Sequence, residues 1–402
     1  MSGLSPAIVL GVDSPIGLTV VRELGEQGVP IHAVGSPRSI GRASRYCRGF
    51  TERPRGPIAD WLPDLIAATG ARALLAVSES DLVQLAALPA DIDGCVVLTP
   101  RAGPLAIVLD KAETLRRAAA VGIDTPTSWQ PLVGDDVATQ AALLSYPVVA
   151  KWPNPPAVLP LLEKAGLDFA KAEFLHDAGA LLAMARRYAP IGQWPLVQSY
   201  CPGVGVGQMI FMDQGEAVLR FQHRRLREWP PEGGTSTCCA AEPLDRHASQ
   251  MDKSIALLRS IGWQGPAMVE YRYDERTGTY WLMEVNGRFW GSLPLAWHCG
   301  ARFAWEAYRR AILADHRPTL PPRIGLRARY MVPDTRRLLR VLFGARAIAD
   351  PTFAVRPWRE LLAYAGDFLD PRARYYVGTL LDPGPVWRDA LSIAGKALRL
   401  RN

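Results

Sequence analysis

The chain has 402 residues, of which 49% are hydrophobic and 21% charged, a composition typical of a folded protein with two or three domains and unlike that of a disordered one. The net charge is +7, but the segment from Pro321 to Asn402 carries 15 basic and 7 acidic residues, so the first 320 residues are nearly neutral. The main body therefore lacks the basic stripe of nucleic-acid-binding proteins, and we expect no nucleic-acid partner.

Residues 7–34 predict a strand, a tight turn, a helix and a second strand, which is how a parallel sheet begins. The strands are expected at 7–11 and 31–34 and the helix at 18–27, followed by helices at 61–69 and 81–88 and strands at 73–77 and 96–98. The turn has Gly11 and Gly17, but Asp13 stands where the dinucleotide fingerprint requires a glycine, which argues against NAD or FAD. The helix N-terminus could instead offer its N–H groups to an anionic substrate.

A different pattern begins after residue 109. It predicts helices at 111–121 and 177–187 and strands at 146–151, 169–173 and 195–198. Only six of the 46 basic residues are lysines, so a lysine marks a position that needs an ammonium point charge rather than a guanidinium fork. Lys111 begins the first of these helices, Lys151 ends a strand, and Lys171 lies in the next predicted strand.

The segment 267–292 predicts a hairpin that carries carboxylates. It follows strands at 208–212 and 217–222 and a helix at 252–261, and its own loop, 275–279, contains Gly278. If Asp274 faces Tyr280, Glu270 falls opposite Glu284 on the same face of the hairpin. Asn286 lies two residues further along the strand and therefore points to that face as well.

Two opposed carboxylates repel each other unless a cation neutralises them, and an amide oxygen beside them completes an all-oxygen site suited to Mg²⁺. A solvated hairpin face is the alternative, but it predicts a basic residue opposite Glu270. A glycosidase pair of carboxylates is a second alternative, which explains neither Asn286 nor the upstream lysines.

At this point the sequence resembles the ATP-grasp superfamily, specifically its predicted carboxylate–amine ligase branch. The resemblance is carried by Asp110-Lys111, by the segments 146–151 and 197–203, and by Glu270 with the segment 284–288; residues 221–236 resemble an uncharacterised subgroup. It implies an α/β (α+β) protein in which a Rossmann-like pre-ATP-grasp domain at 1–109 precedes a two-lobed ATP-grasp domain at 110–320. The small lobe would span about 125–198, the large lobe about 199–320, and a basic, mostly helical C-terminal extension would follow at 321–402.

The resemblance also implies roles for individual residues. Contacts with ATP would come from the lysines and from the hinge between the lobes, whose backbone would read adenine: Lys111, Lys151, Lys171, Gln198, Ser199 and Tyr200. Two Mg²⁺ ions, for which Mn²⁺ is an alternative, would be held by Glu270, Glu284 and Asn286. Arg288 would stabilise the transferred phosphoryl group or the acyl phosphate. Arg224 and Arg225, beside the glycine-containing loop 233–237, suit an anionic carboxylate or acyl phosphate.

Three departures from the family pattern stand out. The segment between Lys151 and Lys171 lacks the usual run of glycines over the phosphates. Ser199 stands where related hinges often have glutamate, and the segment 204–207 has no acidic residue to bind ribose hydroxyls.

The leading hypothesis is an ATP-dependent ligase that joins a carboxylate to an amine through an acyl phosphate and releases ADP and phosphate. One alternative is a carboxylase or nucleotide-biosynthesis ligase that uses bicarbonate or formate, and another is a non-catalytic ATP-binding regulatory protein. The substrates would be small molecules. Arg38, Arg42, Arg45 and the loop 78–81 follow strand ends, where α/β sheets bind ligands, but they do not name the acid or the amine.

The remaining expectations concern location and partners. The six cysteines include no CxxC pair and are expected to be reduced thiols; with no apolar run of about 20 residues and no signal-peptide pattern, this predicts a cytoplasmic protein. Basic amphipathic helices at 336–343 and 385–401 are expected to pack on the core, with peripheral contact to an anionic membrane as the alternative. A homodimer is a further expectation.

Overall fold

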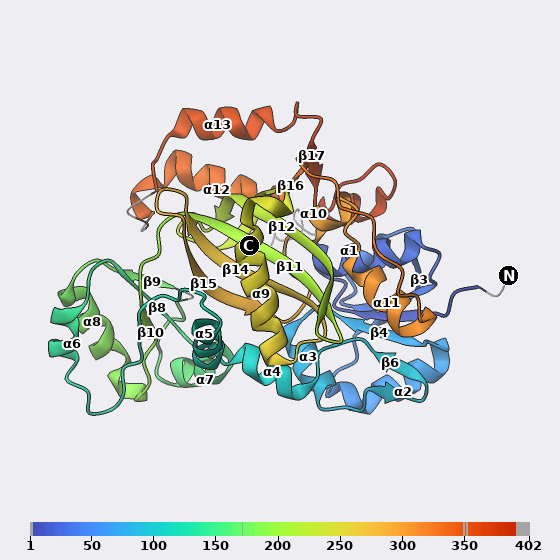
Figure 1. Cartoon of the computed structure of the whole chain (residues 1–402), viewed down its shortest axis with the longest axis horizontal. Coiled ribbons are helices and arrows are strands. Elements are labelled where there is room, and N and C mark those ends of the chain that lie inside the picture. Colours follow the sequence, from blue (N-terminus) through green and yellow to red (C-terminus); the bar gives the residue numbers. More distant parts are fainter. Residues whose placement is uncertain (1–2, 171, 349, 351–352, 391–402) are drawn as a thin grey trace, which may run out of the picture.

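A computed structural model describes residues 3–170, 172–348, 350 and 353–390. They form a six-stranded, a four-stranded and a seven-stranded sheet, with helices packed between and around them (Figure 1). The mixed α/β architecture expected from the sequence is therefore present. No helix within the described residues combines the length and apolarity needed to cross a bilayer.

The N-terminal sheet has the strand order β3-β2-β1-β4-β6-β5 and is parallel except between β5 and β6. Its strands are β1 (Ala7–Leu10), β2 (Ile31–Gly35), β3 (Cys47–Glu52), β4 (Ala73–Ala76), β5 (Asp91–Ile92) and β6 (Cys95–Val97), and its helices are α1 (Pro15–Glu26), α2 (Ile58–Thr69), α3 (Glu79–Ala86) and α4 (Ala102–Leu109). The turn before α1 requires its glycine, because a Cβ on Gly17 would lie 2.5 Å from the carbonyl oxygen of Gly11. Ser14 caps the helix by accepting a hydrogen bond from the Gly17 amide.

The antiparallel four-stranded sheet has its own hydrophobic core. Its strands are β7 (Ser128–Trp129), β8 (Val148–Lys151), β9 (Glu173–Leu175) and β10 (Leu196–Ser199), and the helices beside it are α6 (Val137–Leu143), α7 (Pro155–Lys164) and α8 (Ala178–Tyr188). Helix α5 (Lys111–Ala120), which precedes this sheet in the chain, packs instead in a hydrophobic cluster with residues of the other two sheets. The strand expected at 169–173 begins later, at Glu173. Helix α7, which begins after Asn154 caps it, occupies the segment that lacks the glycine run.

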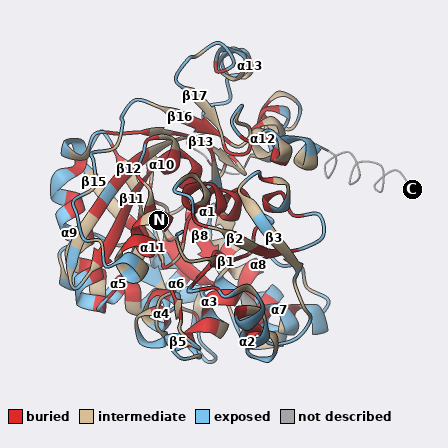
Figure 2. Ribbon diagram, turned by 90° about the vertical axis from the view of Figure 1, so that its right-hand side faces the viewer, coloured by how far each residue is buried: buried red, intermediate tan, exposed pale blue. Residues whose placement is uncertain are grey.

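The seven-stranded sheet has the order β15-β14-β11-β12-β13-β16-β17. Its strands are β11 (Val204–Asp213), β12 (Glu216–Trp229), β13 (Thr235–Ala241), β14 (Gly265–Asp274), β15 (Thr279–Asn286), β16 (Arg327–Arg329) and β17 (Ala373–Tyr375), and its helices are α9 (Ala248–Ile261), α10 (Leu293–His298), α11 (Phe303–Leu313), α12 (Met331–Phe343) and α13 (Pro357–Gly366). Buried residues of this sheet and of the N-terminal sheet join in shared hydrophobic clusters, so the two sheets pack as one body (Figure 2).

The segment after Pro321 contains the expected basic helix α12, but it also adds β16 and β17 to the edge of the seven-stranded sheet. Two buried carboxylates fix it in place. Asp334 accepts from Arg227 at 2.8 Å and from Arg329 at 3.0 Å, and Asp382 accepts from Arg22 at 2.9 Å in the N-terminal unit. The second expected helix, 385–401, is helical over its first six residues, 385–390, and the remainder lies outside the described residues.

Candidate active site

A cavity of about 380 Å³ lies between the four-stranded and the seven-stranded sheets. It is lined by most of the residues to which the sequence assigned ATP, metal or catalytic roles. These are Lys111, Lys151, Gln198, Ser199, Tyr200, Arg225, Glu270, Glu284, Asn286 and Arg288. They come from α5, β8, β10, β12, β14, β15 and the segment after β15, so only the folded chain brings them together.

The predicted carboxylate pair is present in the hairpin of β14 and β15. Glu270 lies directly opposite Glu284, as predicted. The assumption that led to this pairing was wrong, however, because Asp274 pairs with Thr279 and not with Tyr280. A bulge between Glu270 and Tyr271 shifts the register by one residue. Glu270 therefore lies opposite Glu284 even though the pairing at the tip of the hairpin differs from the assumed one.

Neighbouring groups hold the two carboxylates together. The Asn286 side-chain amide donates to Glu284 Oε1 at 2.9 Å, which leaves the amide oxygen of Asn286 available as a ligand. Arg225 donates to Glu270 Oε2 and, at 3.3 Å, to Glu228 Oε1. Arg272 lies 3.5 Å from the other oxygen of Glu228. Glu270 is thus paired with a cation, while Glu284 projects into the open cavity.

The pKa values of the two carboxyls move apart. Burial raises the pKa of Glu270, and the negative charge of Glu284 raises it further. The positive charge of Arg225 opposes both effects but does not outweigh them, so the pKa stays above its ordinary value. Burial would also raise the pKa of Glu284, but the Asn286 hydrogen bond and the charges of Lys111 and Arg225 together bring it below the ordinary value. Glu284 is therefore the readier anionic ligand of the two.

Two lysines face this pair. Lys111 is the first residue of α5, whose N-cap Asp110 accepts from the Glu113 amide at 3.0 Å, and Lys151 is the last residue of β8. Burial lowers the pKa of both ammonium groups, although the charges of Glu270 and Glu284 oppose this shift. The pKa of Lys151 falls to about 8, because the positive charge of Lys111 adds to the effect of burial. Two desolvated cations that repel each other would gain from a polyanion placed between them.

The predicted hinge residues border the cavity where β10 ends. Gln198 donates through its side chain to Ser128 Oγ at 2.9 Å, and the Ser199 amide donates to the Thr127 carbonyl at 2.8 Å. The Tyr200 hydroxyl donates to Asp350 at 2.9 Å, which connects the hinge to the C-terminal segment. These contacts fix the Gln198 and Tyr200 side chains, and the backbone amides of Ser199 and Tyr200 are already engaged within the protein. The assignment of this segment to adenine stays a prediction.

The structure separates the two neighbouring arginines of β12. Arg225 lies in the cavity, whereas Arg224 pairs with Glu275 at 2.9 Å and does not line it. The prediction that Arg224 belongs to the site is not supported, because successive residues of a strand point to opposite faces of the sheet. Lys171, predicted to contact ATP, lies outside the described residues.

Three further residues line the cavity. Glu228 lines the cavity because β12 is irregular between Arg225 and Glu228, which strict alternation could not predict. Arg272 is two residues from Glu270 on the same strand, a signal that the sequence did contain. Buried His223 contacts Ser292 Oγ through Nδ1 at 3.0 Å, and burial lowers its pKa to about 3, so it is neutral.

Glycines of β11 leave space for the side chains of β12. A Cβ on Gly205 would lie 2.6 Å from the Arg225 side chain, and one on Gly207 would lie 3.0 Å from His223. The segment Val204–Gly207, noted in the sequence for lacking an acidic residue, thus lets Arg225 lie flat and reach Glu270. We attribute the glycines to this packing.

No family model and no curated protein matches the sequence. Solved structures do match. N5-carboxyaminoimidazole synthetase from Staphylococcus aureus, complexed with ADP, aligns with a TM-score of 0.61 at 11% identity over 88% of this chain and 91% of that chain. The biotin carboxylase domain of 2-oxoglutarate carboxylase from Hydrogenobacter thermophilus, in complex with MgADP, ADP and bicarbonate, aligns with a TM-score of 0.60 at 16% identity over 81% and 73% of the two chains.

Biotin carboxylase from Campylobacter jejuni, in complex with β-γ-ATP, aligns with a TM-score of 0.57 at 12% identity over 80% of this chain and 74% of that chain. At such identities the likeness extends to the fold and not to the reaction. The hairpin of carboxylates, the two lysines and the three structural matches agree on one architecture: the chain has the ATP-grasp fold.

Proposed function

We propose that the protein is an ATP-dependent ligase that joins a carboxylate to an amine and releases ADP and phosphate. The observation that carries the proposal is the arrangement of Glu270, Glu284 and Asn286 opposite Lys111 and Lys151 across one cavity. Three of the matching structures hold ADP or an ATP analogue, which supports a nucleotide in this cavity.

The donor set fits Mg²⁺. It consists of two carboxylates and an amide oxygen, the hard ligands that Mg²⁺ prefers. Within the described residues no group of three or more His, Cys, Asp or Glu side chains could hold a metal by itself, so phosphate oxygens and water would complete the coordination. Bound there, the ion would withdraw charge from the phosphates. The number of ions stays a prediction, as does Mn²⁺ as a substitute.

The proposed reaction has two steps. An oxygen of the acid attacks the γ-phosphorus, the bond from that phosphorus to the bridging oxygen breaks, and ADP leaves. The amine nitrogen then attacks the acyl carbon, the carbon–oxygen bond to phosphate breaks, and the nitrogen loses its proton as the amide forms. Lys111 and Lys151 would neutralise the phosphates, and Arg288 the transferred group; catalysis would come from positioning and electrostatics.

Arg225 has a specific role in this proposal. In the unloaded protein it neutralises Glu270, and its pKa is raised, because the charges of Glu270 and Glu228 outweigh burial. With Glu270 neutralised by a bound metal ion, the Arg225 Nη2 group that now donates to Glu270 would become available to the acid or the acyl phosphate, while Glu228 and the Gly234 carbonyl hold the rest of the guanidinium in place. It is a positively charged group that remains protonated in either state.

A second candidate is a ligase that uses bicarbonate. Two observations favour it: one matching structure contains bicarbonate, and another is an N5-carboxyaminoimidazole synthetase. The same cavity would serve, because bicarbonate is itself a carboxylate that can be phosphorylated.

The test is release of ADP and phosphate from Mg–ATP with pools of carboxylic acids, with bicarbonate, and with and without amines. ADP formation that requires both an acid and an amine is the expected result. Bicarbonate-dependent release without another acid would favour the second candidate, and ATP binding without release on any substrate would favour a regulatory protein.

Matched variants make this test specific. Glu284→Gln should abolish release. Arg225→Gln should lower it strongly, whereas Arg224→Gln, on the opposite face of the same strand, should leave it near wild type. Equal effects of the two arginine substitutions would contradict the placement of the site. A cytoplasmic location, a homodimer and membrane contact by the C-terminal helices stay predictions.

A further inference from the structure

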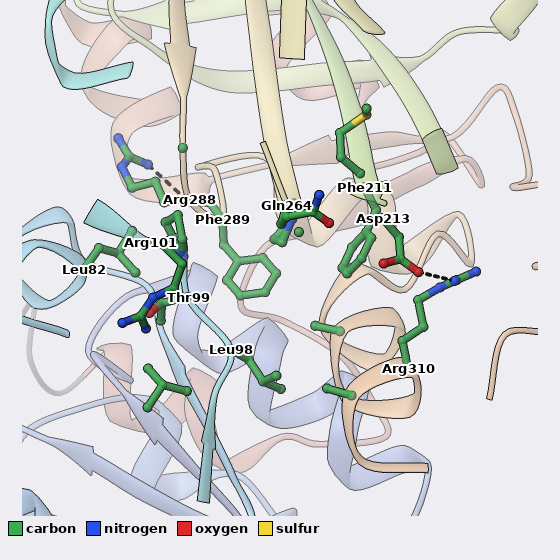
Figure 3. A pocket seen from close by; sticks show the side chains of 18 of the residues that line it. Leu82, Leu98, Thr99, Arg101, Phe211, Asp213, Gln264, Arg288, Phe289 and Arg310 are labelled. Atoms are coloured by element: carbon green, nitrogen blue, oxygen red, sulfur yellow. Dashed lines mark hydrogen bonds and ion pairs between the residues drawn. The ribbon is translucent and has the colours of Figure 1, made fainter. Parts of the chain in front are cut away.

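A second cavity, of about 300 Å³, lies between the N-terminal sheet and the seven-stranded sheet (Figure 3). One wall is formed by the carboxyl ends of β4 and β6 and the loop 98–101. The other is formed by the end of β11, the start of β14, the segment after β15, and α11. Open α/β sheets bind ligands at the carboxyl ends of their strands. Of the residues that the proposed reaction uses, Arg288 lines this cavity.

The floor of the second cavity is apolar. Ala76, Val97, Phe211, Phe289 and Ala307 line it, and each is between 3% and 6% exposed. The side chains of Phe211, Phe289 and Leu98 lie around the same space in Figure 3. A ligand would therefore bury a compact hydrocarbon body here, which is the main source of affinity in such pockets.

The two ends of the second cavity differ in charge. Arg101 and Arg288 lie together at one end, on the left of Figure 3, and Asp213 and Arg310 lie at the other. Asp213 and Arg310 neutralise each other across 2.6 Å. Arg101 donates to the neutral Leu88 carbonyl and so keeps its net charge. An elongated ligand with one anionic end would be oriented by this asymmetry.

Arg288 lines both cavities. Its guanidinium donates to the Phe289 carbonyl at 3.1 Å and lies only 3.9 Å from Glu79, whose side chain is half exposed. That loose ion pair can be exchanged for a carboxylate of a ligand. Arg288 therefore stands at the boundary where an acid in the second cavity would meet the phosphates in the first.

We propose that the second cavity holds the apolar body of the acid substrate, with its carboxylate at Arg288. The inference rests on the proposed ligase function and names its substrate class: a carboxylic acid with a compact aromatic or branched aliphatic body. The acid would enter between the N-terminal and ATP-grasp units, and its carboxylate would be the group that is phosphorylated.

The first experiment measures binding of phenylpropanoate to the full chain loaded with Mg–ADP, by calorimetry. Phenylpropanamide, which lacks the charge, and acetate, which lacks the body, are the comparison ligands. We expect both to bind at least about tenfold more weakly than phenylpropanoate. Equal binding of the amide, or no measurable binding of phenylpropanoate, would overturn the inference.

Two substitutions test the position of the ligand. Ala307→Leu fills the buried floor, and Gln264→Trp narrows the mouth from an exposed position, where it removes one surface hydrogen bond, from the Gln214 amide. Both should weaken phenylpropanoate binding at least about tenfold while Mg–ADP affinity and melting temperature stay near wild type. Ala365→Leu, an exposed alanine of α13 outside both cavities, is the matched control and should change nothing. Unaltered binding in both cavity variants would place the acid elsewhere.

Failure of this inference can be distinguished from failure of the proposed function. If Mg–ADP binds and Glu284→Gln weakens that binding, but phenylpropanoate does not bind, the acid class is wrong and the nucleotide site stands. If bicarbonate alone drives ADP release, the apolar acid is excluded and the second candidate function gains. If Mg–ADP does not bind, both proposals fall.

Discussion

The pKa of Lys151, about 8 in the unliganded protein against an ordinary 10.5, predicts how nucleotide binding depends on pH. Burial and the charge of Lys111 expel the proton from the free enzyme, whereas a bound phosphate would retain it. The affinity for Mg–ATP should therefore be nearly constant below pH 7 and fall about tenfold between pH 7 and pH 9, since binding above pH 8 requires uptake of one proton. The total loss is limited to about 300-fold, the factor of the 2.5 pKa units that separate the two values.

Calorimetric titration of Mg–ADP between pH 7 and pH 9.5 measures this dependence. Lys151→Arg keeps its charge at every pH and should remove the decline, whereas Lys253→Arg, on the exposed face of α9, should keep it. A wild-type affinity that is constant from pH 7 to pH 9.5, or a decline that persists in Lys151→Arg, would refute the assignment of Lys151 to the phosphates.

The lowered pKa of Lys151 also makes the stability of the folded protein depend on pH, and this stability increases with pH while the affinity for nucleotide decreases. The unfolded chain binds the proton of Lys151 more tightly than the folded chain does, so this lysine destabilises the protein below pH 8 and ceases to do so above about pH 10.5. The shift corresponds to about 3 kcal/mol. Lys151→Met should thus raise the melting temperature at pH 7 while abolishing turnover, and an unchanged or lower melting temperature would contradict the pKa.

Three further predictions concern the metal site and the fold. Glu284→Gln should weaken Mg–ADP binding at least about tenfold with little change in melting temperature, because it removes one anionic ligand from a solvent-facing position; retained affinity in calorimetry would exclude Glu284 as a ligand. Asp334→Ala should lower the free energy of unfolding in urea by about 3–5 kcal/mol, since two buried guanidinium groups, Arg227 and Arg329, would then share Asp367 as their one remaining carboxylate, and a change below about 1 kcal/mol would refute this. Gly203→Ala should cost more than about 1–3 kcal/mol, because its φ is +103° and a Cβ would lie 2.1 Å from the Tyr273 carbonyl oxygen, whereas Gly103→Ala, which meets no atom within 4 Å, should be neutral or stabilising.

The sequence predicted those parts of the site that depend on local pattern. Strand alternation and a glycine-containing loop indicated a hairpin that carries Glu270 and Glu284 on its two strands, and Asp110 before Lys111 marked the start of α5. The pairing at the tip of the hairpin was wrong, and a bulge that no pattern announces compensated for it.

Features that depend on irregular strands or distant partners could not be predicted. Which of Arg224 and Arg225 enters the cavity depends on the register of β12 against β11, and Glu228 reaches it through an irregularity in that strand. The strands β16 and β17 have three residues each and are stabilised by pairing: β16 pairs with β13, which lies about 90 residues earlier in the chain, and β17 pairs with β16. The second cavity likewise joins residues from Ala76 to His316 and has no sequence motif.

Isotope transfer tests most directly whether a carboxylate attacks the γ-phosphate of ATP. The acid identified by the release assay, labelled with oxygen-18 in its carboxylate, is incubated with Mg–ATP and its amine, and the released phosphate is examined by phosphorus NMR. Transfer of one labelled oxygen to phosphate, together with ADP, is the predicted result. Label in AMP, with release of pyrophosphate, would mean adenylation and would contradict the account.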